Sequence, residues 1–487
     1  MTSETTTRKK SAGYAGFVTT LLTLTNIVVG FAFQSLIASK LGLSGLADQF
    51  QLGWTIVTFG TTVFFALVPM VLVPRIHDGS NILFLGDLRA FWALGMVATA
   101  AQAIYALTLT GSLSTILLLS APSHILAALT CGAQAVAYLQ HRFALAAAGG
   151  VANGIGLFTW VAISGWNNTS ALTLGTGIAI GYLAQFIAAA LPVARVMWRS
   201  RWTNQIGLRA ILALFAFTLI TKFQPVLERI LTTDLQTGAT AALGFGQKIA
   251  QGLLLLCAFG LALTAVGTIS KHLANNDHRA AARILERTIA TTVIATSLVS
   301  AAFIPFSLLA VHVLFVRGEF TSEDALTVQN TILLQLPWVL ACALTGAMTS
   351  YLYIERAYIR VGVASVIGLV VTVTTGLALS RNFPAEAVPI ASSAGAVVTC
   401  IAVALSLRKS PVWGHTREIL HDDLQILILF PAIFFATLTV WVTVSLSSNG
   451  SLPPLLLSGA TFVCSGILSV SFSTVRDRIR TLLSDAA

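Results

Sequence analysis

The chain has 487 residues, of which 56% are hydrophobic and 9% are charged, and its mean hydropathy is +0.85. A soluble globular domain carries about 25% charged residues, so the composition excludes that class and indicates an integral membrane protein. Apolar segments of about 20 residues, the length of a membrane-spanning helix, recur along the whole chain. The alternating strands expected of a membrane barrel do not recur, and the predicted fold class is all-α.

We predict about 14 transmembrane helices from these apolar segments. Their approximate bounds are 12–38, 50–74, 90–110, 115–139, 143–165, 171–194, 207–231, 237–267, 288–314, 325–353, 361–379, 388–407, 425–446 and 453–473. The connections between them are short, and no separate soluble domain is expected.

The positions of the basic residues predict the orientation of these helices. With the N-terminus in the cytoplasm, 22 of the 28 Lys and Arg residues fall in cytoplasmic segments, which is the bias of the positive-inside rule. Both termini are then cytoplasmic. The net charge of +10 reflects this topology and contact with anionic lipid, so no nucleic-acid partner is expected.

Two pairs of short segments indicate that the chain contains a repeat. LIASKLGLSGLADQF from Leu36 resembles ILTTDLQTGATAAL from Ile230, and LQHRFALAAAG from Leu139 resembles IERAYIRVGVA from Ile354. These offsets predict two parallel six-helix lobes around a central cavity, followed by two C-terminal helices. The expected divisions are a cytoplasmic N-terminus at 1–11, an N-terminal lobe at 12–194, a cytoplasmic linker at 195–206, a C-terminal lobe at 207–407, a cytoplasmic loop at 408–424, spans 13 and 14 at 425–473, and a cytoplasmic tail at 474–487.

Two lysines are predicted to lie deep in the membrane, in the second half of the chain. Lys248, in the stretch FGQKIAQG, is about 16 Å into span 8, and Lys222 is about as far from the end of span 7. An embedded charge costs roughly 2.5 to 3.5 kcal/mol and usually faces a polar interior. Gln247 and Gln251 flank Lys248, and Gln224 accompanies Lys222 next to Pro225, which predicts a kink. This set suits an anionic ligand that carries hydroxyl or amide groups, although a purely structural role remains the alternative.

Other polar residues gather near the predicted outer ends of the helices. Glu228 and Arg229 are expected there, where they can pair with each other or with Asp234. The first six spans carry no charged residue in their interiors. Their polar residues at the outer hairpin are Gln34, Asp48 and Gln51.

No cofactor, metal or catalytic group is expected. The five cysteines have no paired spacing and no companion histidines, and they are interpreted as apolar core residues; they are Cys131, Cys257, Cys342, Cys400 and Cys464. Nucleotide-binding loops and catalytic triads are absent from the sequence, so the chain is not expected to be an enzyme.

Three segments together resemble the MurJ (MviN) lipid II flippase family of the multidrug/oligosaccharidyl-lipid/polysaccharide exporter superfamily. LFVRGEFTSEDALTVQN, Leu314 to Asn330, is similar to that family's outer loop before span 10, with characteristic residues at Arg317, Gly318, Phe320, Thr321 and Asp324. The hairpin LGLSGLADQF with Asp48 is a second match, and FGQKIAQG is a third, with lysine where the family usually has arginine. Locally, Thr321 and Asp324 also suit a helix start.

The resemblance implies a non-enzymatic flippase in the bacterial cytoplasmic membrane. Two lobes would alternate between inward and outward openings while the glycan headgroup of an undecaprenyl-pyrophosphate-linked, lipid II-like precursor crosses between them. The implied partners are this lipid-linked glycan, membrane lipids and cell-wall synthesis proteins. The expected substrate-binding residues are Lys248, Lys222, Gln247, Gln251, Gln224, Asp48, Gln34 and Gln51, and the expected gating or structural residues are Glu228, Arg229, Arg317, Thr321, Asp324 and Gly30.

The first lobe departs from the family pattern at its cationic positions. Where the family's first span has arginines and an acid, this chain has Ile27, Phe33 and Gln34, although Gly30 is kept. In span 2, Thr61 and Thr62 replace another usual arginine pair. Without these cations the first lobe loses charge-assisted contacts to a pyrophosphate. Two alternatives therefore stay open: a cation-coupled multidrug exporter of the same superfamily, and a non-transporting scaffold in cell-wall synthesis.

Overall fold

The structure is a computed structural model that describes residues 2–68, 88–140, 142–165, 169–199, 208–259, 268–273, 275–410, 430–432 and 434–439. All regular elements in these ranges are helical. Ten of the described helices are long and apolar enough to cross a membrane, or 11 if a bent pair counts as one span. The all-α membrane fold is confirmed, while predicted spans 13 and 14 and the end of span 8 lie largely outside the described residues.

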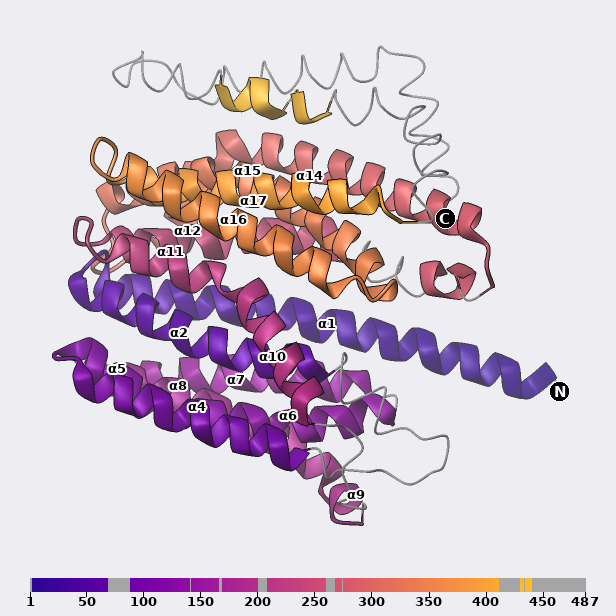
Figure 1. Cartoon of the computed structure of the whole chain (residues 1–487). Coiled ribbons are helices and arrows are strands. Elements are labelled where there is room, and N and C mark those ends of the chain that lie inside the picture. Colours follow the sequence, from indigo (N-terminus) through magenta and orange to yellow (C-terminus); the bar gives the residue numbers. More distant parts are fainter. Residues whose placement is uncertain are drawn as a thin grey trace. The chain divides into compact units, whose positions relative to one another are not determined.

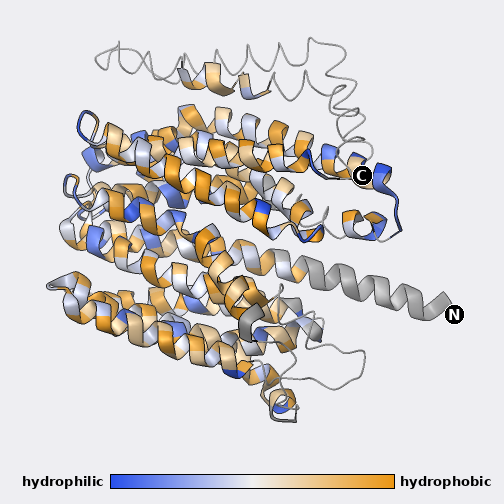
Figure 2. Cartoon of the chain, viewed as in Figure 1, coloured by the Kyte–Doolittle hydropathy of each residue, from blue (hydrophilic) through white to orange (hydrophobic). Residues whose placement is uncertain are grey.

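The surface of the helices is apolar along much of its length. Large hydrophobic side chains are strongly exposed, including Leu107 at 71%, Ile163 at 73% and Ile359 at 82%. Figure 2 shows hydrophobic residues along the helices and hydrophilic ones gathered at several of the turns. A helix satisfies its own backbone hydrogen bonds, so such side chains can face lipid.

Backbone contacts divide the chain into two compact units. Unit 1 comprises residues 1–241 and 314–321, and unit 2 comprises 242–313 and 322–487. The two units are defined by the contacts within each of them. The predicted lobes at 12–194 and 207–407 are instead defined as bodies that would move during transport, and they stay a prediction. The helices that lie wholly in unit 1 (Figure 1) are α1 (Thr2–Leu41), α2 (Gly45–Leu67), α4 (Leu88–Thr108), α5 (Ser112–Ser120), α6 (Ser123–Leu139), α7 (Phe143–Ser164), α8 (Ala171–Ala190), η2 (Leu191–Val193), α9 (Ala194–Arg199), α10 (Leu208–Lys222) and α11 (Gln224–Thr232).

Span 7 of the prediction is bent and packs against α2. The α10 segment that ends at Lys222 and the α11 segment that begins at Gln224 meet at 45°. Pro225 lies in the first turn of α11, where it removes a backbone donor, so the predicted kink is confirmed. Both helices contact α2 within unit 1. Phe59 on α2 packs edge-on against Phe223 at the bend, with ring centroids 5.7 Å apart.

Span 4 of the prediction is broken into α5 and α6 at Pro122. The side chain of Gln102 on α4 donates to the carbonyl oxygen of Leu117 at 2.8 Å, so it supplies a donor near the break. Because that amide donates, its oxygen accepts from Nε2 of His124 at 2.6 Å. His124 is buried, and its ring lies against Gly60 of α2, where an added Cβ would come within 2.4 Å of it.

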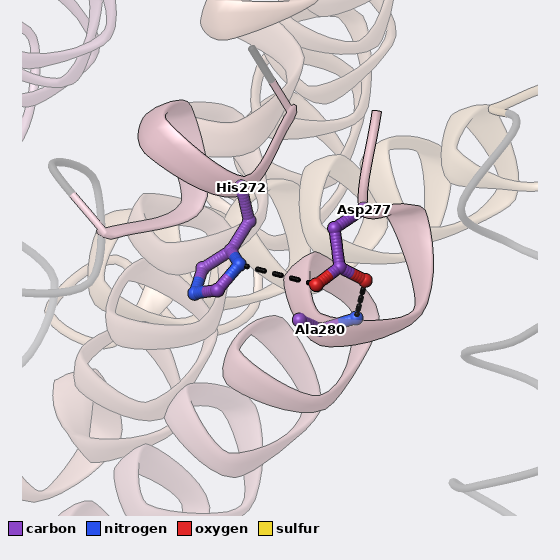
Figure 3. A network of polar contacts seen from close by, with 3 residues as sticks. All are labelled: His272, Asp277 and Ala280. Atoms are coloured by element: carbon purple, nitrogen blue, oxygen red, sulfur yellow. Dashed lines mark hydrogen bonds and ion pairs between the residues drawn. The ribbon is translucent and has the colours of Figure 1, made fainter. Parts of the chain in front are cut away.

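Unit 2 contains most of α12 (Ala239–Leu254), which begins in unit 1, together with the π-helical segment η3 (Leu255–Phe259). Its longer helices are α14 (His278–Phe315), α15 (Ser322–Ile354), α16 (Tyr358–Leu379) and α17 (Ala387–Leu407). Asp277 stands just before α14 and accepts from the backbone N–H of Ala280 at 3.1 Å. Nδ1 of His272 lies 3.4 Å from the other carboxylate oxygen. Figure 3 shows the His272 ring and the Asp277 carboxylate facing each other. A carboxylate at this position stabilises a helix start.

Helices α16 and α17 cross where glycine and threonine face each other twice. An added Cβ at Gly395 would lie 2.0 Å from Oγ1 of Thr372 and 2.8 Å from the carbonyl oxygen of Gly368. An added Cβ at Gly368 would lie 1.9 Å from Oγ1 of Thr399. Glycine therefore lets the two backbones approach, as small residues do in membrane helix pairs.

We expect Gly395→Ala to destabilise unit 2 by about 1–3 kcal/mol, because the new methyl group has no room at the crossing. The measurement is the melting temperature of the purified protein in detergent. Gly346→Ala on α15 is the matched control, because no atom lies within 4 Å of its added Cβ. Equal melting temperatures for the two variants would contradict the packing argument.

Candidate functional site

The turn after α1 and the turn before α12 lie against each other in unit 1. They belong to the two hairpins that the sequence pairs as repeats. Asp48, in the first turn of α2, accepts from the backbone N–H of Gly238 at 2.7 Å and from that of Ala241 at 2.8 Å. Its carboxylate thus lies at the N-terminus of α12, where the backbone donors and the helix dipole favour a negative charge.

Gly238 is required by this contact for two reasons. Its φ is +90°, a conformation that residues with a side chain rarely adopt. An added Cβ would also lie 2.8 Å from the carbonyl oxygen of Leu43 in the other hairpin. The close approach of the two turns therefore depends on glycine at this position.

A buried arginine lies next to the Asp48 carboxylate. Arg229 on α11 is 3% exposed and interacts electrostatically with both Asp48 and Glu228. Its Nε donates to Oγ1 of Thr55 on α2 at 3.3 Å, and its Nη1 donates to the carbonyl oxygen of Thr240 at 3.2 Å. A buried guanidinium needs such partners, because an uncompensated charge in the interior costs several kcal/mol.

Neighbouring polar groups complete this arrangement. Glu228 is 1% exposed and accepts from Nε2 of Gln224 at 2.9 Å. The hydroxyls of Thr232 and Thr240, both buried, lie 2.8 Å apart. We call the following residues the hairpin cluster: Asp48, Thr55, Glu228, Arg229, Thr232 and Thr240.

A third turn, between α14 and α15, joins the end of α1. The backbone N–H of Glu319 donates to the carbonyl oxygen of Ser39 at 2.9 Å. The hydroxyl of Ser35 donates to the carbonyl oxygen of Leu314. Gly318 has a φ of +59°, and an added Cβ would lie 2.1 Å from the oxygen of Ser39. The outer-loop motif of the sequence therefore attaches this turn to the end of α1.

The remaining predicted gating residues lie outside the hairpin cluster. Arg317 is exposed and donates from Nη2 to the carbonyl oxygen of Leu314 at 3.1 Å. Thr321 directly precedes α15, and Asp324 lies in its first turn, as expected of a helix start. Gly30 lies within α1 and is partly exposed.

Neither predicted lysine is sealed in the protein interior. Lys222 is exposed at the last residue of α10, directly before the bend. Lys248 is partly exposed on α12 in unit 2, between a buried Gln247 and an exposed Gln251 one turn further along. Gln224 is engaged with Glu228, as described above. A shared ligand for the two lysines stays a prediction.

Two polar residues of the first hairpin, Gln34 and Gln51, bind each other. Nε2 of Gln51 donates to Oε1 of Gln34 at 3.0 Å, and both side chains are buried. Thr61, at a position where the family usually has arginine, has its hydroxyl 2.6 Å from the hydroxyl of the buried Tyr182 on α8. The first six helices therefore use these positions for contacts among themselves.

Sequence reasoning did not single out the threonines of the hairpin cluster or the backbone donors at residues 238 and 241. Threonine is common in membrane helices, and Thr55, Thr232 and Thr240 carry no motif. The one usable signal was the repeat itself, since equivalent hairpins of two similar lobes can meet at the axis that relates them.

The fold and the embedded polar groups define an all-helical membrane transporter. An inward-facing MATE-family multidrug resistance transporter of the MOP superfamily has a TM-score of 0.54 at 11% identity, over 82% of this chain and 95% of that one. A mutant of the Vibrio cholerae MATE transporter VcmN has a TM-score of 0.53 at 14% identity, over 84% and 100% of the two chains. A solved structure titled lipid II flippase MurJ, inward closed conformation, has a TM-score of 0.74 at 13% identity, over 95% and 100%.

The family model described as Lipid II flippase MurJ matches residues 88–458, which is more than half of the chain. The chain therefore belongs to the MurJ lipid II flippase family. No curated protein sequence matches it.

We expect Asp48→Asn to loosen the start of α12, because the amide keeps the shape of the carboxylate but loses the charge and one acceptor oxygen. The loss of a helix cap costs about 0.5–2 kcal/mol. Hydrogen–deuterium exchange of the amides at residues 238–242 should become faster. Asp234→Asn, at an exposed position beside the same turn, should leave it unchanged. Protection of these amides in Asp48→Asn equal to wild type would disprove the capping role.

Proposed function

We propose that this protein moves an undecaprenyl-pyrophosphate-linked glycan precursor, similar to lipid II, from the inner to the outer leaflet of a bacterial cytoplasmic membrane. The match to the family over residues 88–458 supports precursor flipping in general. The proposed substrate class rests on the exposure of the two lysines. Lys222 is exposed and Lys248 partly exposed, although both lie in predicted spans. Cations at such positions can meet the negative charge of a pyrophosphate.

The proposed mechanism is alternating access between the predicted lobes at 12–194 and 207–407. In the orientation that the basic residues predict, the hairpin cluster lies at the outer end of the helices. The hydrogen bonds of Asp48 and Arg229 then hold the outer side closed while the headgroup enters from the cytoplasm. Opening to the outside requires that these bonds break, because they join the first hairpin to the second. These hydrogen bonds stabilise the state that is closed to the outside, so the free energy of substrate binding has to offset their loss when the outer side opens.

The first lobe lacks charged residues that the family usually has, and this determines where the pyrophosphate is expected to bind. Thr61 and Gln34 occupy positions where the family carries an arginine and an acid, and the structure shows both bonded to neighbours in unit 1. The pyrophosphate is therefore expected to bind at the second lobe. The first lobe would contribute hydroxyl and amide groups to the sugar.

The charge of Lys248 is predicted to be necessary for flipping. Lys248→Gln should lower precursor flipping about tenfold to a hundredfold, because a hydrogen bond to a charged group contributes about 1.5–3 kcal/mol. Lys248→Arg should retain activity, since arginine keeps the charge. The assay is growth and precursor flipping in bacterial cells depleted of their own flippase. Lys271→Gln, an exposed position in the same unit, is the control.

Full activity of Lys248→Gln would remove this lysine from the mechanism. Activity of neither the wild type nor any variant, combined with capture of a cell-wall synthesis protein, would favour the scaffold alternative.

Opening of the outer turns is predicted to be obligatory. Residues 39 and 319 are joined by a backbone hydrogen bond, so Ser39→Cys with Glu319→Cys places two thiols on facing turns. An oxidised pair should block flipping, and a reducing agent should restore it. The two single-cysteine variants are the controls, and both should stay active after oxidation. Undiminished flipping by a fully cross-linked protein would rule out opening at this turn.

A multidrug exporter is the second candidate, and the fold likeness to MATE transporters favours it. That chemistry normally uses a membrane-embedded carboxylate that exchanges a cation for the drug. The buried Glu228 is already held by Gln224 and Arg229, which makes it a poor exchange site. Drug-susceptibility profiles of cells with and without the protein discriminate the two functions.

A further inference from the structure

A histidine lies buried in unit 1, at the break of predicted span 4. Pro122 separates α5 from α6 and has no N–H to donate to the preceding turn. The carbonyl oxygen of Leu117, near this break, accepts from Nε2 of Gln102 on α4. His124 follows in the first turn of α6 and is 4% exposed. Side chains thus hold the break together, and the His124 ring is bonded to one of them.

The hydrogen bonds of Gln102 determine which nitrogen of the His124 ring carries the proton. Nε2 of Gln102 donates to the carbonyl oxygen of Leu117 at 2.8 Å and to Oγ of Ser120 at 3.2 Å. Both amide hydrogens are then used, so the amide oxygen accepts from Nε2 of His124 at 2.6 Å. In the neutral ring the other nitrogen, Nδ1, keeps a lone pair, and it is buried without a hydrogen-bond partner in the described residues. Nδ1 is therefore the atom at which the ring can take up a proton.

Helix α2 lies directly against this nitrogen. An added Cβ at Gly60 of α2 would lie 2.4 Å from Cε1 of His124 and 2.8 Å from its Nδ1. On α4, an added Cβ at Gly95 would lie 3.3 Å from the carbonyl oxygen of His124. Glycine lets both helices approach, and the contact leaves a proton on Nδ1 without an acceptor.

The helices that pack against α6 bring no charged group to the ring within the described residues. Their titratable groups are Asp48 on α2, Arg89 and Tyr105 on α4, Tyr182 on α8, Arg195 and Arg199 on α9, with Cys131 and Tyr138 on α6 itself. Asp48, the one carboxylate of this set, is 12 residues from Gly60, which is about 18 Å along α2. The hydroxyl of Tyr182 is engaged with that of Thr61 at 2.6 Å. A positive charge on the packed ring would therefore be uncompensated.

We propose that His124 is a proton-binding site that controls the contact between α2 and α6. A buried charge without partners is costly, so the packed arrangement keeps the ring neutral. A proton on Nδ1 needs water or another acceptor, and either one requires that α2 move away from the ring. The arrangement that binds a proton better is favoured as the pH falls. Acid therefore opens the α2–α6 contact, and neutral pH closes it.

Helix α2 connects this site to the hairpin cluster. Asp48 and Thr55 of the cluster lie on the same helix as Gly60. A movement of α2 at Gly60 would displace the groups that hold the outer turns, so proton uptake would favour their release. This last step rests on the proposed function, whereas the proton site itself does not.

The test is hydrogen–deuterium exchange of the purified full chain at about pH 5.5 and about pH 7.5, on either side of the usual range for histidine. Exchange rates are corrected for the direct effect of pH on amide chemistry. The wild-type amides of residues 56–64 and 120–128 should exchange about tenfold faster or more in acid, because one pH unit of linked proton binding corresponds to a factor of ten. His124→Gln should exchange equally at both pH values, since glutamine can donate to Gln102 but is never charged.

The matched control is His312→Gln, because His312 also lies within a predicted span but on α14. It should keep the acid response of wild type. Absence of the response from wild type, or an undiminished response in His124→Gln, would overturn the proposal.

Gln102→Glu gives a result that a purely structural role does not predict. A carboxylate beside Nε2 stabilises a charged ring in the packed arrangement, so the faster exchange in acid should disappear. An unchanged acid response would count against the proton site. The wild-type measurement decides the question even where neither variant folds. None of these measurements requires the cargo, so their failure leaves the proposed flipping untouched, and a chain that does not flip can still show the proton site.

Discussion

A guanidinium buried among helices has to find negative and accepting groups close by, and in unit 1 that requirement links segments far apart in the chain. Arg229 is held by Thr55 from the first hairpin, by the carbonyl of Thr240 from the second, and by the electrostatic attraction of Asp48 and Glu228. Asp48 in turn binds the first turn of α12. Removing Arg229 would take away the buried positive charge that attracts both Asp48 and Glu228, so the two hairpins are held together as one arrangement.

The transport proposal follows from this arrangement together with the position of the lysines. Bonds within the hairpin cluster are numerous but individually modest, and several of them end on backbone atoms. The transport proposal gives this arrangement two states, with the bonds made or broken, as alternating access would require. Lys222 lies directly before the bend between α10 and α11. A movement of that bend would carry the lysine with it.

Composition and periodicity were enough to predict an all-helical membrane protein, and the kink at Pro225 followed from the chemistry of proline. Asp48, Glu228 and Arg229 also stood out, because charged residues near apolar spans need partners. Their partners were not predictable. Arg229 was expected to meet Glu228 or Asp234, but its bonds to Thr55 and Thr240 depend on helix packing.

The contact between Asp48 and α12 uses main-chain nitrogen atoms, which every residue except proline possesses. Substitutions at positions 239 to 241 can therefore accumulate without loss of the hydrogen bonds, provided that residue 238 remains glycine and the helix still begins there. The junction therefore constrains the backbone conformation at residues 238–241 more than it constrains the identity of their side chains.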